Sequence, residues 1–187
     1  SVTISGTATE DEVLTAANTL ADEDGLGTIS YTWSNGDTGA TTTLGQSDVG
    51  NAITVTAAYT DSQGAAESST SAATSAVANV NDNPTGSVVI SGTATEDQVL
   101  SITNTLADED VLGSFSYVWK RAGTAISSAT SATYTLVQAD VGSAITVTVS
   151  YTDGQDTAES STSAATSAVA NVNDDPTGSV TISGTPT

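Results

Sequence analysis

The side chains of this protein that could do chemistry are almost all carboxylates. Its 187 residues include 22 Asp and Glu, two Lys and Arg, and no His or Cys, which gives a formal net charge of -20. Without imidazole or thiolate ligands a soft-metal site is excluded, and oxygen ligands favour calcium or magnesium. The charge also excludes nucleic acid as a partner, because phosphate binding needs basic side chains. The sequence therefore predicts cation binding by oxygen.

The acidic residues recur in the same order in two stretches of the chain. An early Glu-Asp pair, an Asp-x-Asp pair and a later single Asp precede an Asn-Val-Asn-Asp-x-Pro segment, and the series then repeats. Calcium needs 6 to 8 oxygens, which one such cluster can supply, and unneutralised carboxylates at close range would repel. We predict Ca²⁺ as the cofactor, with these ligands: Glu10, Asp11, Asp22, Asp24, Asp61, Asn81, Asp82, Glu96, Asp108, Asp110, Asp153, Asn173 and Asp174.

Each of these residues has a plainer interpretation as ordinary turn or linker solvation. Asp48 and Asp140 follow a strand pattern by a few residues, and we expect them to accept backbone N-H groups instead of binding metal. Glu67 and Glu159 fit a ligand role and an exposed strand position equally well.

The chain is built from an internal repeat. Leu14 matches Leu100, 86 residues later, and Leu44 matches Leu136, 92 residues later, so the second copy is six residues longer. We assign repeat 1 to residues 1–86 with a linker at 79–86, and repeat 2 to residues 87–178 with a linker at 171–178. Residues 179–187 match the opening of a repeat and are expected to be the first strand of a truncated third one.

Short runs rich in Val, Ile, Thr and Tyr, punctuated by Gly, Asn and Asp, predict an all-β fold. In repeat 1 the expected strands are 2–7, 13–21, 28–34, 40–44, 51–60 and 66–80. Trp33 and Trp119 are expected in the core, and Leu44-x3-Asp48-x-Gly50 is typical of the turn between strands E and F of an immunoglobulin-like sandwich. Few aromatic residues predict a thin core that needs extra stabilisation.

The six additional residues of repeat 2 fall between Trp119 and Leu136, beside the only two basic residues, Lys120 and Arg121. These two residues are interpreted either as part of a solvated hairpin or as a contact point.

Two families resemble this pattern. The order of Glu10, the Asn-x-Asn-Asp-Asn linker, Asp108-x-Asp110 and Asp153 is similar to that of cadherins, whose junctions bind calcium between tandem immunoglobulin-like domains. The amino-acid sequence of nearly the whole repeat, including SGTATEDQVL and YTLVQADVGSAITVTVSYTD, resembles the extender repeats of bacterial RTX-type adhesins. The resemblance implies tandem immunoglobulin-like, cadherin-like β-sandwiches arranged end to end.

The expected function is structural: a calcium-stiffened extender segment of a large bacterial surface adhesin, located outside the cell. Its expected partners are neighbouring copies of the same repeat, while other domains of the parent protein bind the ligand. No apolar run long enough to span a membrane and no signal peptide pattern occurs, so we expect no membrane insertion. The alternative is a glycan- or protein-binding immunoglobulin-like module. An enzyme is not expected, because no nucleophile motif or cleft is indicated.

Overall fold

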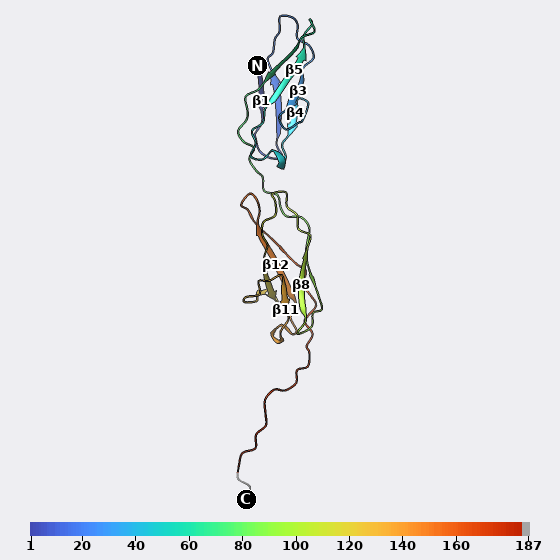
Figure 1. The fold of residues 1–187 in the computed structure, drawn as a ribbon, viewed down its shortest axis with the longest axis vertical. Coiled ribbons are helices and arrows are strands. Elements are labelled where there is room, and N and C mark those ends of the chain that lie inside the picture. The colour runs from blue at the N-terminus through green and yellow to red at the C-terminus, as the bar shows by residue number, and fades with distance from the viewer. Residues whose placement is uncertain (185–187) are drawn as a thin grey trace. The chain divides into compact units, whose positions relative to one another are not determined.

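The computed structural model describes residues 1–184, which divide into two compact units, unit 1 (Ser1–Asp82) and unit 2 (from Asn83). In unit 1, one antiparallel sheet has the order β1 (Val2–Ser5), β2 (Val13–Asn18), β4 (Thr41–Thr43). The other sheet has the order β3 (Ser30–Trp33), β5 (Val55–Thr60), β6 (Ala66–Thr70) (Figure 1). A 3-10 turn, η1 (Gln46–Asp48), joins β4 to β5.

Unit 2 repeats this plan with one additional strand. Its first sheet has the order β7 (Val88–Ser91), β8 (Val99–Asn104), β11 (Thr133–Thr135). Its second has the order β10 (Thr124–Ala125), β9 (Ser116–Arg121), β12 (Ile145–Thr152), β13 (Ala158–Thr162), and η2 (Gln138–Asp140) precedes β12. Each unit is thus an all-β, immunoglobulin-like sandwich, as the sequence predicted.

The six additional residues of repeat 2 build β10. Arg121 pairs with Thr124 across Ala122 and Gly123, whose φ angles of 44° and 84° are those of a two-residue hairpin turn. The insertion therefore extends the second sheet by one short strand.

Each sandwich has its own core around a tryptophan. Trp33 and Trp119 are 2% and 0% exposed, and each indole Nε1 donates a hydrogen bond of 2.9 Å to a backbone carbonyl, that of Gly39 or Ser131. Alternate residues of β5 and β12 point inward and are completely buried, including Val55, Ala57 and Val147. The expectation that both tryptophans are core residues is confirmed.

Several predicted strands are too long, because side chains interrupt the ladders. Asn18 ends β2, since its Oδ1 accepts the backbone N-H of Leu20 at 3.2 Å. The expected strand 66–80 is wrong as a continuous strand: β6 ends at Thr70, and only isolated bridges at 76–78 follow. Residues 179–184 form no strand, since strands need partners and none of the described residues pairs with them. Residues 185–187 lie outside the described residues.

The break after β6 and β13 depends on serine hydroxyl groups. Ser163 Oγ accepts the backbone N-H of Val147 at 3.1 Å, while Ser163 N donates to Val147 O, and Ser71 makes the same two bonds with Val55. The hydroxyl stands in for a ladder carbonyl, so the chain leaves the sheet without leaving a buried N-H unpaired. Beyond the break, Ala78 bridges in parallel to Thr9, which brings the final segment to the opposite sheet.

Ser163→Ala should lower the free energy of unfolding of unit 2 by about 1 to 3 kcal/mol, the usual cost of an unsatisfied buried donor. Val147 is completely buried, so water does not replace the lost acceptor. Chemical denaturation followed by Trp fluorescence would measure the change. Ser160→Ala, at an exposed position of β13, is the control and should be neutral; equal effects of the two changes would refute the role given to the Ser163 hydroxyl.

Charge is segregated within each unit. Of the 22 acidic residues, only Glu67 and Glu159 lie in strands, and the others occupy loops, turns and linkers. The outward faces of the sheets carry mostly Ser, Thr, Ala and Val. Within residues 1–184 no helix is long and apolar enough to cross a membrane.

Candidate metal centre

One end of unit 1 gathers the first Asp-x-Asp pair and a third aspartate. The loop after β2 holds Asp22 and Asp24, and the turn between β5 and β6 holds Asp61. A carboxylate oxygen of each residue lies within 4.8 Å of those of the other two. The structure thus brings together Asp22, Asp24 and Asp61, as expected for a cation site.

Backbone turns fix these carboxylates from one side. Asp22 Oδ1 accepts the N-H of Asp24 at 2.9 Å, and Asp61 Oδ1 accepts the N-H groups of Gln63 and Ala65 at 2.9 and 2.8 Å. Aspartate commonly caps tight turns in this way. The turn chemistry and the ligand role are compatible, because the turn bonds use only Oδ1 of Asp22 and of Asp61.

A tyrosine of the central strand binds that second oxygen of the first aspartate in each repeat. Tyr59 OH donates to Asp22 Oδ2 at 2.8 Å, and Tyr151 OH donates to Asp108 Oδ2. The hydrogen bond to Asp22 raises the pKa of Tyr59, and burial together with the bond to Asp108 raises the pKa of Tyr151. Both phenols therefore position an Asp-x-Asp carboxylate, a role that the sequence analysis did not assign.

The corresponding group of unit 2 contains an unsatisfied buried oxygen. Asp108 Oδ1 accepts the N-H of Asp110 at 3.0 Å, and Asp153 Oδ1 accepts those of Gln155 and Thr157, both at 2.8 Å. Asp153 is only 6% exposed, and its Oδ2 has no hydrogen-bond partner among the described residues. A buried carboxylate oxygen without a donor is costly unless a cation neutralises it, so this donor set fits calcium.

The opposite end of each unit is organised by a buried glutamate. Glu10 and Glu96 are each 3% exposed, and Oε2 of each accepts a linker N-H at 3.1 Å, from Val80 and Val172. With the Gln46 amide nitrogen facing Glu10, Nε2 also donates to Oε1 at 2.8 Å. The glutamate therefore ties the start of the linker to its own sandwich.

In the first linker, Asp82 offers a carboxylate oxygen within 4.8 Å of one from Glu10, and Asn81 donates to the carbonyl of Asp82. Asn79 Oδ1 is buried without a hydrogen-bond partner in the described part of the chain. The predicted ligand set omits Asn79, although it is the first residue of the linker. The orphaned amide oxygen makes it a candidate ligand.

The remaining predicted residues are less constrained. Asp11 and its counterpart Asp97 are exposed and adopt left-handed φ angles of 62° and 63°, as turn residues do. Asn173 and Asp174 are exposed in the second linker, where Asn171 accepts a hydrogen bond from Gln138. Their role as ligands stays a prediction.

Raised tyrosine pKa values predict a loss of stability in alkali. A phenol with an unfolded pKa near 10 and a higher folded pKa contributes stability that is present below pH about 10 and is lost as pH rises through the folded value. We expect the stability difference between the native chain and Tyr151→Phe to shrink above pH 10, as measured by denaturant melts across that range. Tyr117→Phe is the control, and parallel profiles for Tyr151→Phe and the native chain would contradict the prediction.

Comparisons with known proteins return only distant matches. No protein-family model matches the chain, and no curated protein matches it. Three solved structures are similar at low identity. The three N-terminal domains of the bacteriophage RB49 Highly Immunogenic Outer Capsid protein (Hoc) are 17% identical with a TM-score of 0.30, covering 87% of this chain and 59% of that one.

The fibronectin(III)-like modules of Clostridium thermocellum CbhA are 16% identical with a TM-score of 0.32, covering 96% and 100% of the two chains. A tetra-tandem repeat in the extending region of a large adhesion protein is 19% identical with a TM-score of 0.29, covering 89% and 48%. The chain thus spans about half to three fifths of two of these structures. Its own strand order defines the class, an immunoglobulin-like repeat protein.

Proposed function

We propose that this chain is a structural extender segment of a large bacterial surface adhesin of the RTX type, stiffened by calcium at the linkers between its repeats. In this proposal the chain lies outside the cell and holds a distal ligand-binding region away from the surface. Copies of the same repeat are its immediate partners, and it performs no catalysis.

The observation that carries the proposal is the bond between the buried glutamate and the linker. Oε2 of Glu10 holds the N-H of Val80, and Oε2 of Glu96 holds that of Val172, at the same distance of 3.1 Å in both repeats. A cation bound to this glutamate would therefore be coupled directly to the linker backbone. Such coupling is what a calcium-dependent stiffening of the linker requires.

Two orphaned oxygens support calcium as the ion. Asn79 Oδ1 lies in the linker, and Asp153 Oδ2 lies in the turn that follows β12. We propose that Glu10, Asn79 and Asp82 are calcium ligands in unit 1, and that Asp108, Asp110 and Asp153 are calcium ligands in unit 2. Glu10, Asp82, Asp108, Asp110 and Asp153 would supply the negative charge, while amide and backbone oxygens complete the coordination.

Extracellular calcium modules typically bind in the range of about 10⁻⁴ to 10⁻³ M, so the sites would fill outside a cell and not inside. When bound, calcium would neutralise the negative charge of the clustered carboxylates. The residues of the chain supply the geometry: the turn N-H groups and the tyrosines hold the aspartates, and the glutamate holds the linker.

Small-angle X-ray scattering of this chain in chelator, in millimolar calcium and in millimolar magnesium tests the proposal. Calcium alone should lengthen and sharpen the distance distribution to that of two domains in a fixed arrangement. Glu10→Gln keeps an acceptor for Val80 N but removes the charge, and it should abolish the response. Glu12→Gln, at an exposed position nearby, is the matched control. Identical profiles in all three buffers would refute calcium stiffening and favour the binding-module alternative.

A further inference from the structure

A polar pocket of about 370 Å³ lies beside η1 in unit 1. Its lining includes the buried Asp48, the amides of Asn35 and Asn51, and the hydroxyl groups of Ser34 and Ser47. It lies where β4 turns into β5, at the end of the sandwich opposite to Asp22, Asp24 and Asp61; this end also holds Glu10, which Gln46 of η1 faces.

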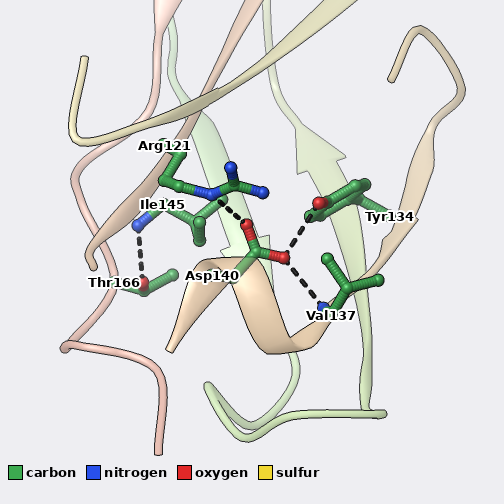
Figure 2. Close-up of polar contacts among 6 residues, drawn as sticks. All are labelled: Arg121, Tyr134, Val137, Asp140, Ile145 and Thr166. Atoms are coloured by element: carbon green, nitrogen blue, oxygen red, sulfur yellow. Dashed lines mark hydrogen bonds and ion pairs between the residues drawn. The ribbon is translucent and has the colours of Figure 1, made fainter. Parts of the chain in front are cut away.

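Unit 2 contains a second copy of this corner, in which a cation binds the aspartate. Asp140 Oδ2 accepts the N-H of Val137 and the hydroxyl of Tyr134, both at 2.8 Å (Figure 2). Its Oδ1 accepts Nε of Arg121 at 2.6 Å, so both carboxylate oxygens are paired and the charge is neutralised. The expectation that Asp140 and Asp48 accept backbone N-H groups is confirmed.

The register of the strands shows what unit 1 has instead. Trp33 pairs with Val55 as Trp119 pairs with Val147, so Asn35 occupies the position of Arg121. Thr42 pairs with Leu14 as Tyr134 pairs with Leu100, so Thr42 replaces the tyrosine. At this corner, unit 1 thus has neither the guanidinium group nor the phenol that bind the aspartate in unit 2.

The Asp48 carboxylate is only partly satisfied by these replacements. Oδ2 accepts the N-H of Gly45 at 3.1 Å and Nδ2 of Asn35 at 3.3 Å, and no hydrogen bond from the described residues reaches Oδ1. The hydroxyl of Thr42 donates to a second carboxylate, Asp37, at 2.5 Å. The corner of unit 1 therefore holds two carboxylates, Asp37 and Asp48, and no basic side chain. In unit 2 the single carboxylate of Asp140 is paired with Arg121.

Unit 1 has no cation of its own to offset this charge. The only two basic residues of the chain, Lys120 and Arg121, both lie in unit 2. Asp48 is 7% exposed, and a buried carboxylate is favourable only when it is paired. Asp37 does not line the pocket, so the pocket itself offers calcium one carboxylate, whereas a planar guanidinium donates in the geometry that a carboxylate accepts.

We propose that the pocket beside Asp48 binds the guanidinium group of an arginine side chain presented by a partner protein, in the manner in which Arg121 binds Asp140 within unit 2. Asp48 Oδ1 accepts the guanidinium hydrogen bond, and the amide and hydroxyl groups of the lining accept the others. None of the residues that line the pocket is a proposed calcium ligand, although the neighbouring Gln46 of η1 faces Glu10.

The test is a titration of the ¹⁵N-labelled chain with N-acetyl-arginine amide, followed by NMR. Resonances of Asn35 and Asn51, which line the pocket, should shift in a saturable way, and the uncharged citrulline analogue should leave them unchanged. Calcium chloride forms the third arm. Calcium bound at Glu10 should shift Gln46 in any case. Shifts of Asn35 and Asn51 with calcium but not with arginine would replace the proposal by a metal site, and no shift of these two residues with arginine would overturn it.

Two variants locate the binding. Asp48→Asn should weaken arginine binding by about tenfold or more, because the charge-assisted bond is lost. Asn35→Arg should place a guanidinium in the pocket from within the chain, so it should abolish binding of the probe and raise the melting temperature of unit 1. Undiminished arginine binding by the folded Asn35→Arg variant would show that the probe binds elsewhere.

Discussion

Replacing Arg121 with Met should lower the free energy of unfolding of unit 2 by about 3 kcal/mol, at the lower end of the range for removing one partner of a buried ion pair. Asp140 is 0% exposed and would keep its charge with only a backbone N-H and the Tyr134 hydroxyl to offset it. The guanidinium itself is partly exposed, which is why the lower end applies. Denaturant melts monitored through Trp119, in a Trp33→Phe background, would measure the change.

The controls separate charge from packing. Lys120→Met alters the neighbouring residue of β9, which makes no ion pair with any described residue, and should change stability by less than about 0.5 kcal/mol. Asp140→Asn combined with Arg121→Met should recover part of the loss, since the uncompensated charge is gone. An Arg121→Met variant as stable as the native chain would show that the ion pair with Arg121 is not needed to stabilise the Asp140 carboxylate in the folded state.

Calcium at about a hundred times its dissociation constant should stabilise the chain by about 2.7 kcal/mol for each independent site. For domains of this size that energy corresponds to a rise in melting temperature of roughly 10 to 20 °C over the value in chelator. The physical reason is that Asp153 keeps an unpaired buried oxygen, whose repulsion with the Asp-x-Asp carboxylates costs stability until a cation binds. Thermal melts in chelator and in millimolar calcium would measure the difference.

Asp153→Asn should remove most of the calcium-dependent rise in unit 2, because the amide cannot neutralise the ion. Asp156→Asn is the matched control: it lies in the same turn, is exposed, and has a φ of 68° that Asn also tolerates. A full calcium response in Asp153→Asn, or equal losses in the two variants, would remove Asp153 from the ligand set. Magnesium should stabilise far less, since it demands a smaller octahedral site.

The fold could be predicted from the sequence where local signals agree with tertiary packing. Alternation of apolar residues located most strands, and the spacing of Leu44, Asp48 and Gly50 located the buried corner. The continuous strand expected at 66–80 failed because propensity does not reveal that the Ser71 hydroxyl replaces a ladder carbonyl. That contact joins residues 16 positions apart and depends on the packed sheet.

The sequence predicted which acidic residues of the candidate site come together, but not the side chains that hold them in place. The spacing of Asp22, Asp24 and Asp61 placed them in loops at one end of a sandwich, and their oxygens do come together. The tyrosine bonds to Asp22 and Asp108 span 37 and 43 residues, so no local pattern indicates them. Arg121 fits a solvated hairpin by its sequence, yet it binds a buried aspartate 19 residues away.

The placement of the two basic residues has a consequence for proteolysis. Trypsin cleaves after Lys and Arg, and both of its sites lie in β9, where Lys120 and Arg121 are paired with β10 on one side and β12 on the other. A protease needs an extended strand that is free of such pairing, so cleavage must wait until unit 2 opens locally or globally. Unit 1 contains no site at all. Tryptic nicking of this chain is therefore a direct readout of the opening of unit 2, the only unit that contains the cleavage sites.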